Sequence, residues 1–186
     1  MISLHLLVKD EEKLIGALLE YLMAWVEEII VIDTGSTDKT LTIASQYTHK
    51  VYSAALNHDF AAARNYGLGF VTKPMVFQVD ADEWPTEELM NHIHASKPFD
   101  GAMMVRRENL VGGQPIGDHT YEWHPRFFSK DYRFVGRIHE KLNVAPCRTT
   151  FAPESALLLH HKSRERQQAQ NERYMEWEEQ RRLVCK

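Results

Sequence analysis

The chain has 186 residues, the size of one α/β domain with a sizeable core. Apolar residues make up 44% of it and charged residues 26%, which is ordinary for a globular protein. The formal net charge is −4, so no overall positive field points to nucleic acid or to an anionic membrane. The two cysteines, Cys147 and Cys185, are too few for a disulfide framework or a zinc cluster, and they fit a reducing cytoplasm.

The N-terminal apolar run, Ile2 to Val8, leads directly into a charged stretch at 9–12. It is too short for a signal peptide and predicts a strand. No stretch approaches the length of a membrane-spanning helix. We therefore expect a soluble, cytoplasmic protein without a transmembrane segment.

The first hundred residues alternate between apolar runs of strand character and segments with helical spacing. Strands are predicted over residues 2–8, 29–32, 51–52 and 75–79. Helices are predicted over residues 14–22, 41–47 and 60–68, and another is predicted to begin at Pro85. This alternation predicts right-handed crossovers and a mostly parallel sheet, with ligands at the carboxyl ends of its strands.

The pattern changes near residue 100. Shorter strands are predicted over residues 103–107, 126–128, 132–134 and 156–160, and a polar helix over 164–182. We interpret residues 1–186 as a single domain. Its first half, about 1–100, is predicted to bind a nucleotide, and its second half, about 101–186, an acceptor.

Asp80 and Asp82 follow the buried run Met75 to Val79 directly. Two carboxylates two residues apart form a compact oxygen ligand pair that suits Mg²⁺ or Mn²⁺, particularly when a diphosphate supplies further oxygens. Asp33 likewise ends the predicted strand 29–32, and the carboxyl ends of parallel strands meet at one edge of a sheet. The two segments together suggest a nucleotide-diphosphate site at that edge.

Several motifs in order resemble the inverting, nucleotide-sugar-dependent glycosyltransferases of family 2, which have the GT-A fold. In the first half they are VKDEE at 8–12, VIDTGSTD at 31–38, DFAAARN at 59–65 and DADEW at 80–84. The second half adds PRFF at 125–128, FVGRIHE at 134–140 and HH at 160–161. The resemblance implies an α/β domain whose mixed, mostly parallel central sheet is flanked by helices.

The resemblance also implies a reaction and a site. A sugar would move from a nucleoside diphosphate, most often UDP, to an acceptor with inversion, and Mn²⁺ or Mg²⁺ would be the cofactor. Asp82 is implied as the direct metal ligand, Asp80 as a contact to the ribose or the metal, and His160 as a third metal ligand. Donor contacts are implied for four further residues: Lys9, Glu11, Asp33 and Arg64.

Other readings of these residues stay open. Asp33 can cap the helix that follows it, Arg64 can be a surface arginine with a buried stem, and His160 can be merely solvated. For the catalytic base we predict Glu140, with Glu122 and Asp118 as the alternatives.

The segment from Asp33 to Ser36 also matches the aspartic-protease signature, but no second copy exists and a helical pattern follows it. The remaining alternative is a catalytically silent nucleotide-sugar or glycan-binding module of the same fold. It is favoured by the lack of a counterpart, after Glu140, to the Glu-Asp pair that supplies the base in many family members. The sugar, the oligomeric state and the acceptor do not follow from the sequence. A glycan, a lipid-linked sugar, a peptide side chain and a nucleobase are all compatible with it.

Overall fold

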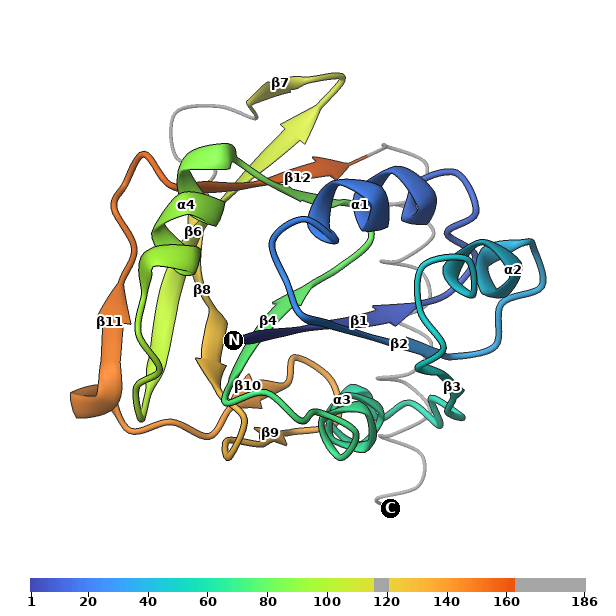
Figure 1. The fold of residues 1–186 in the computed structure, drawn as a ribbon, viewed down its shortest axis with the longest axis horizontal. Coiled ribbons are helices and arrows are strands. Elements are labelled where there is room, and N and C mark those ends of the chain that lie inside the picture. Colours follow the sequence, from blue (N-terminus) through green and yellow to red (C-terminus); the bar gives the residue numbers. More distant parts are fainter. Residues whose placement is uncertain (116–120, 163–186) are drawn as a thin grey trace, which may run out of the picture.

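The computed structural model describes residues 1–115 and 121–162 (Figure 1). Its first half supplies the strands β1 (Ile2–Val8), β2 (Glu28–Asp33), β3 (Val51–Ser53), β4 (Met75–Val79) and β5 (Glu83–Pro85). The second half adds β6 (Ala102–Val111), β7 (Gln114–Pro115), β8 (Tyr121–Ser129), β9 (Phe134–Val135), β10 (Lys141–Leu142), β11 (Thr149–Phe151) and β12 (Leu157–Lys162). The helices are α1 (Ile15–Leu22), α2 (Thr40–Ala44), α3 (Phe60–Leu68), α4 (Glu87–Ala95) and a single 3₁₀ turn, η1 (Pro146–Arg148).

A curled central sheet has the strand order β3-β2-β1-β4-β8-β6-β12-β5, and β7 and β11 pair with β6. The four strands from β3 to β4 are parallel, and β8 joins them to the second half by running antiparallel to both β4 and β6. β9 and β10 form a separate hairpin. The predicted class, a mixed and mostly parallel α/β sheet flanked by helices, is confirmed.

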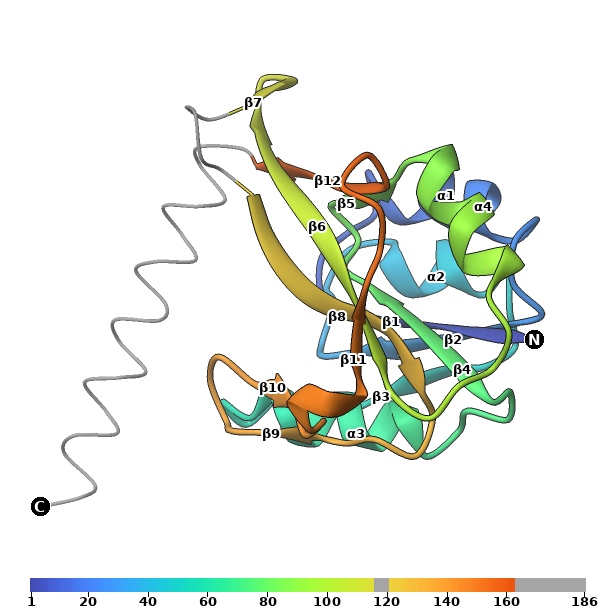
Figure 2. The same cartoon turned by 90° about the vertical axis from the view of Figure 1, so that its left-hand side faces the viewer.

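Helices cover the two faces of the sheet unequally. Figure 2 shows α1, α2 and α4 on one side, with α3 and the β9–β10 hairpin on the other. The larger core lies on the first side, where α1 buries Ile15, Leu18, Leu19 and Leu22 at helical spacing. A smaller core on the second side joins α3 to the hairpin through Phe128 and neighbouring apolar residues.

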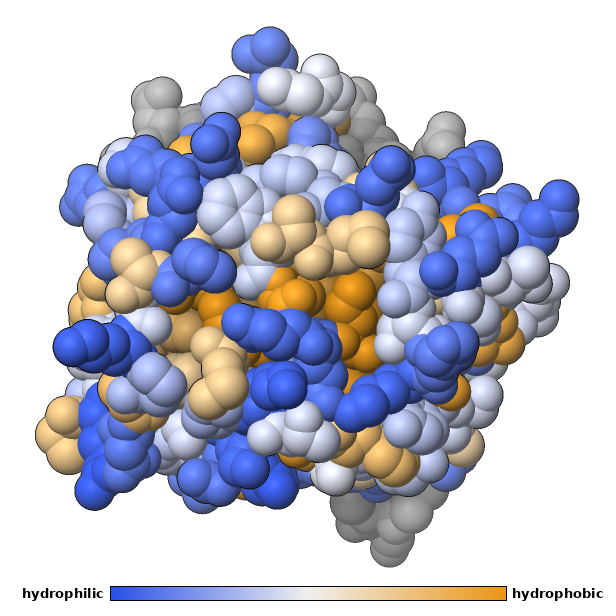
Figure 3. All heavy atoms as spheres, viewed as in Figure 1, coloured by the Kyte–Doolittle hydropathy of each residue, from blue (hydrophilic) through white to orange (hydrophobic). Residues whose placement is uncertain are grey.

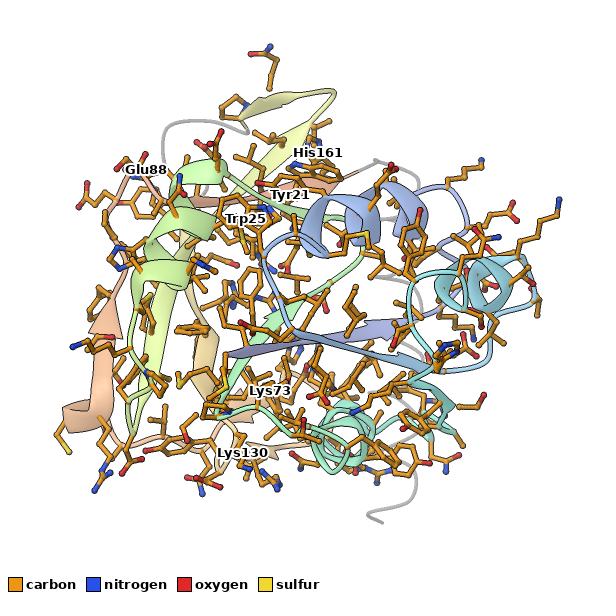
Figure 4. All side chains as sticks on the ribbon, viewed as in Figure 1. Tyr21, Trp25, Lys73, Glu88, Lys130 and His161 are labelled. Atoms are coloured by element: carbon orange, nitrogen blue, oxygen red, sulfur yellow. The ribbon has the colours of Figure 1, made fainter. Side chains whose placement is uncertain are left out.

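Aromatic side chains close the space between α1 and α4. Figure 4 shows Tyr21 and Trp25 pointing into this space. The ring of Tyr21 stacks on Trp84 at 5.1 Å between centroids, and Trp25 meets His94 of α4 edge-on at 6.1 Å. Apolar atoms show near the centre of this face of the molecule, between hydrophilic side chains (Figure 3).

Several predicted boundaries are confirmed and others are wrong. β1, α3 and β4 have the predicted bounds. The prediction that Pro85 begins a helix is wrong, because Pro85 ends β5 and the side chain of Thr86 caps α4 by accepting the N–H of Leu89 at 3.3 Å. The predicted helix at 164–182 lies outside the described residues. Within 1–115 and 121–162, no helix is long and apolar enough to cross a membrane.

Candidate functional site

Polar side chains gather at the carboxyl edge of the parallel strands. β1 lies between β2 and β4, pairing Val8 with Asp33 on one side and Leu6 with Val79 on the other. Asp33 and Asp80 therefore lie at the same edge of the sheet, on the two sides of the end of β1. Such an edge is where ligands bind in open α/β sheets.

Two arginines hold Asp80. Arg64, from α3, donates from Nη2 to Oδ1 at 3.1 Å, and Arg126, from β8, donates from Nη2 to Oδ2 at 3.3 Å. Burial alone would raise the pKa of Asp80, but the charges of Arg64 and Arg126 outweigh it and hold that pKa well below its usual range. Asp80 is therefore ionised, and both of its oxygens are engaged.

Glu83 lies beneath this cluster. Its side chain is fully buried, forms ion pairs with Arg126 and Arg107, and accepts the backbone N–H of Asp80 at 3.0 Å. Burial raises the pKa of Glu83 although the two arginines act against it. These bonds fix the turn that carries Asp80 and Asp82. No role for Glu83, Arg107 or Arg126 follows from the sequence alone, although Glu83 and Arg126 stand within the DADEW and PRFF motifs.

Asp82 faces His160 across the same edge. Oδ2 of Asp82 lies 3.3 Å from Nε2 of His160, and Nδ1 of His160 lies 2.8 Å from Oδ1 of Asn109. β12 pairs with β6 in a register that sets His160 opposite Asn109, and the backbone N–H of His161 donates to the carbonyl of Asp82 at 2.9 Å. An Nδ1–H bond to Asn109 would leave the Nε2 lone pair directed at the carboxylate.

This pair fits a divalent cation. Two ligands at right angles, each about 2.1 Å from one ion, lie about 3 Å apart, close to the separation of Oδ2 and Nε2. No group of three or more His, Cys, Asp or Glu side chains in the described part of the chain is arranged to hold a metal ion. The three predicted ligands thus separate into the Asp82–His160 pair, open to a cation, and Asp80, engaged by arginines.

Glu140 also belongs to the arginine cluster. Its Oε1 accepts the Nε–H of Arg64 at 2.7 Å, and only 8% of the Arg64 side chain is exposed. Burial alone would lower the pKa of Arg64, but Asp80 and Glu140 raise it well above its usual value. The structure thus brings Arg64, Asp80 and Glu140 together and rules out the reading of Arg64 as a surface arginine.

The other predicted donor contacts lie in the loops after β1 and β2. Asp33 accepts the backbone N–H groups of Gly35 at 3.0 Å and Ser36 at 3.2 Å, which stabilises the turn at Gly35 with its φ of +101°. The backbone N–H of Glu11 donates to Oγ1 of Thr40 at 2.7 Å, and Lys9 is exposed. The bond from Glu11 to Thr40 ties the loop after β1 to the start of α2.

Of the two alternative bases, the structure describes Glu122 alone. Glu122, on β8, has a side chain that is 57% exposed, and its Oε2 accepts from Arg107 at 2.5 Å. Asp118 lies outside the described residues.

Parallel strands with acidic and arginine side chains at their carboxyl ends define an α/β domain with a ligand site at that edge. A family model described as Glycosyl transferase family 2 matches residues 3–153. The chain therefore belongs to glycosyl transferase family 2.

Curated relatives and solved structures extend this comparison. A TPR repeat-containing protein of Synechococcus elongatus is 33% identical over 143 residues, which are 75% of this chain and 34% of that protein. A lipopolysaccharide core biosynthesis glycosyltransferase, LpsC, of Rhizobium meliloti is 27% identical over 119 residues, or 60% of this chain and 44% of LpsC. The crystal structure of TarS 1–349 from S. aureus in complex with UDP-GlcNAc superposes with a TM-score of 0.58 at 17% identity, over 87% of this chain and 58% of that one. The chain thus spans less than half the length of these curated relatives.

Proposed function

We propose that this chain is a glycosyltransferase domain that moves a sugar from a nucleoside-diphosphate donor, most simply a UDP-sugar, to an acceptor nucleophile. The arrangement of an Asp82–His160 pair beside the Arg64–Asp80–Arg126 cluster carries the proposal. It offers a place for a cation and guanidinium hydrogen-bond donors at one edge of the sheet, which together suit a diphosphate. Membership of glycosyl transferase family 2 supports it.

Asp82 and His160 would hold Mn²⁺ or Mg²⁺. An imidazole ligand suits Mn²⁺ better than Mg²⁺, which prefers oxygen ligands alone, so we expect Mn²⁺ to bind more tightly. When bound, the ion would neutralise charge on the departing diphosphate. Asp80 would serve the donor through the two arginines that it aligns rather than as a free metal ligand.

Arg64 would contact the donor. Its Nη1 is buried without a hydrogen-bond partner among residues 1–115 and 121–162, while its Nε and Nη2 bind Glu140 and Asp80. A buried N–H without a partner costs free energy that a ligand oxygen can recover. A phosphate oxygen of the donor fits this role, since guanidinium groups bind phosphate strongly.

Transfer with inversion would need one base to take the acceptor's proton while the acceptor attacks from the face opposite the diphosphate. Glu140 was predicted for this role. Its bond to Arg64 instead favours a place on the donor side, because Oε1 is engaged by the guanidinium that also binds Asp80. The base would then come from the acceptor side, which β8 borders.

Calorimetry with UDP tests the proposal. UDP should bind in the presence of Mn²⁺ and lose most of its affinity when EDTA removes the metal. A panel of UDP-sugars, with release of UDP as the readout, should then identify a donor that the protein hydrolyses slowly. UDP binding without turnover on any donor would favour a silent binding module, and equal UDP affinity with and without EDTA would refute the metal site.

A further inference from the structure

His124 lies on β8 at the active edge, and none of the roles proposed above uses it. Its Nε2 lies 3.0 Å from Oε2 of Glu122, and 31% of its side chain is exposed. Glu122 and His124 are two residues apart on β8 and contact each other, and β8 is irregular at Arg126, opposite Met103 and Met104. Along the strand, His124 stands between an acid and the arginine that binds Asp80.

Ion pairs connect the contact between Glu122 and His124 to the donor cluster. Arg107, which binds Glu122, also lies 3.3 Å from Oε1 of Glu83, and Glu83 in turn pairs with Arg126. Nη2 of Arg126 lies 3.3 Å from Oδ2 of Asp80. His124 is therefore joined to the donor cluster through side chains of β5, β6 and β8.

Burial and two arginines keep the ring of His124 neutral. The charged groups that face it are Glu122 and Arg126 on β8 itself and Arg107 on the neighbouring β6. Burial, and then the charges of Arg126 and Arg107, lower the pKa of His124 to about 4, although Glu122 acts in the opposite direction. At neutral pH the ring therefore carries one proton and one lone pair.

Glu122 selects which nitrogen keeps the proton. Its Oε2 also accepts from Arg107 at 2.5 Å, and the bond to His124 helps to lower the pKa of Glu122 below its usual value. An ionised Glu122 accepts an Nε2–H, which leaves the lone pair on Nδ1. Within the described ranges, Nδ1 of His124 has no recorded hydrogen-bond partner.

We propose that His124 is the general base of the transfer and that Glu122 orients it, an inference that rests on the proposed function. The arrangement is that of an imidazole whose far nitrogen is held by a carboxylate, as in other enzymes that activate a hydroxyl group. It supplies an acceptor-side base that is free of the arginine contact that engages Glu140.

The sugar would be transferred in a single displacement. The acceptor oxygen forms a bond to the anomeric carbon while the bond from that carbon to the phosphate oxygen breaks, and UDP leaves with the electron pair. The acceptor's proton passes to Nδ1 of His124, and the resulting imidazolium is stabilised by Glu122. Loss of that proton to water restores the free base.

The test compares His124→Gln and His124→Ala with the wild-type protein and with His49→Gln as a matched control. His49 is an exposed histidine beside the amino end of β3, the edge of the sheet opposite the site. Two quantities are measured for each protein in Mn²⁺: the affinity for UDP by calorimetry, and the release of UDP from the panel donor with water as acceptor. Thermal melts confirm that each variant is folded.

Both His124 variants should keep the UDP affinity within about twofold and lose about 100-fold in the rate of UDP release, the usual contribution of a general base. His49→Gln should match the wild type. Added imidazole should restore release several-fold in His124→Ala and have no such effect on Glu122→Gln or the wild type. A structural defect would show no such rescue.

Other results overturn the proposal. An unchanged rate of UDP release in His124→Gln would show that His124 is not the base. A loss of UDP affinity as large as the loss of release rate would place His124 at the donor instead. A wild-type protein that fails to bind UDP, or that binds it with Mn²⁺ and releases none from any donor, rejects the proposed function and the base with it. Equal UDP release by the wild type and His124→Gln rejects the base alone, so the two failures differ.

Discussion

Asp80 and Asp82 are two residues apart and yet have different surroundings. Both oxygens of Asp80 are engaged by Arg64 and Arg126. Within residues 1–115 and 121–162, the side-chain contact of Asp82 is with a histidine nitrogen at 3.3 Å. A single carboxylate rarely serves both a buried ion pair and a metal. The two carboxylates therefore have different roles. Asp80 holds the two arginines in place, and Asp82 remains available to a cation.

Asp82→Ala should abolish the effect of Mn²⁺ on UDP affinity and leave the fold intact, because its side chain lies at a strand end and contributes little to the core. His160→Ala should weaken the same effect, since it removes the second ligand. Calorimetry with and without Mn²⁺, together with a thermal melt, measures both. Glu20→Ala, an exposed acid on α1, is the control. Unfolding of Asp82→Ala would show that this carboxylate has a structural role instead.

Glu140→Gln separates the two roles considered for Glu140. The ion pair with buried Arg64 is lost, and a charge-assisted bond of this kind contributes about 1.5–3 kcal/mol. We expect the affinity for UDP to fall about tenfold or more, with the release rate of bound donor less affected. Unchanged UDP affinity combined with lost turnover would return Glu140 to the position of base.

His5 should make stability depend on pH. It is fully buried on β1, neither ring nitrogen has a hydrogen-bond partner in the described part of the structure, and burial, together with the charge of Arg64, lowers its pKa to about 3. Between about pH 6.5 and 3 the unfolded chain takes up a proton that the folded one excludes. The stabilisation is thus complete above pH 6.5 and falls by about 1.4 kcal/mol per pH unit below it.

His5→Leu should remove this slope, because leucine does not titrate. Urea unfolding at pH 7.5 and 5.5 should show the wild type losing about 1.4 kcal/mol more than the variant over that interval. His49→Gln, which removes an exposed histidine, should keep the wild-type slope. Burial alone would raise the pKa of Glu28, but hydrogen bonds from Lys50, Ser3 and Thr72 outweigh it and lower that pKa to about 2, so the stability that Glu28 contributes is lost only below about pH 4.5. Equal slopes in wild type and His5→Leu would contradict the assignment.

At the scale of elements, α3 must approach the sheet closely to bring Arg64 to Asp80. Gly67 makes this approach possible, since a Cβ there would lie 2.3 Å from Nε2 of His5 and 2.5 Å from Cγ1 of Ile32. Gly67→Ala should therefore push α3 outward, costing about 1–3 kcal/mol of stability and weakening UDP binding. Unfolding and UDP titrations measure the two effects. Ala62→Ser, on the exposed side of α3, should change neither.

The elements that the sequence predicts well are those defined by local pattern. β1 and β4 are continuous apolar runs, and α3 begins where Asp59 accepts the N–H of Ala62 at 2.8 Å. β5 has no such pattern, because it exists through pairing with β12, where Pro85 meets Leu158. A proline that can begin a helix can also end an edge strand, and only the tertiary partner decides.

The site shows the same difference between what the local sequence determines and what tertiary pairing determines. Asp82 and His160 were named from motif positions, and the structure places them face to face. The Glu83–Arg126 ion pair joins residues 43 apart, and the Arg64–Glu140 pair residues 76 apart. Such pairings depend on which strands become neighbours, and the position of β8 between β4 and β6 has no signal in the local sequence.

At the scale of the whole molecule, β8 joins the donor half to the acceptor half. It is the strand that links the parallel strands β1–β4 to β6 and β12, and it carries Arg126 to Asp80 and His124 to Glu122. The arginine cluster also ties α3, β4 and the segment after β9 to this strand. A ligand that binds there would contact elements from both halves and so stabilise the folded state as a unit.

UDP with Mn²⁺ should accordingly raise the melting temperature of the whole domain. At a hundredfold excess over its dissociation constant, a ligand that binds only the folded state stabilises it by about 2.7 kcal/mol. For a chain of 186 residues this corresponds to a shift of about 5–10 °C. UDP with EDTA should give almost no shift, because the acidic side chains at the edge would repel an unpaired diphosphate. Asp82→Ala should show the small shift under both conditions, and a full shift in that variant would mean that UDP binds elsewhere.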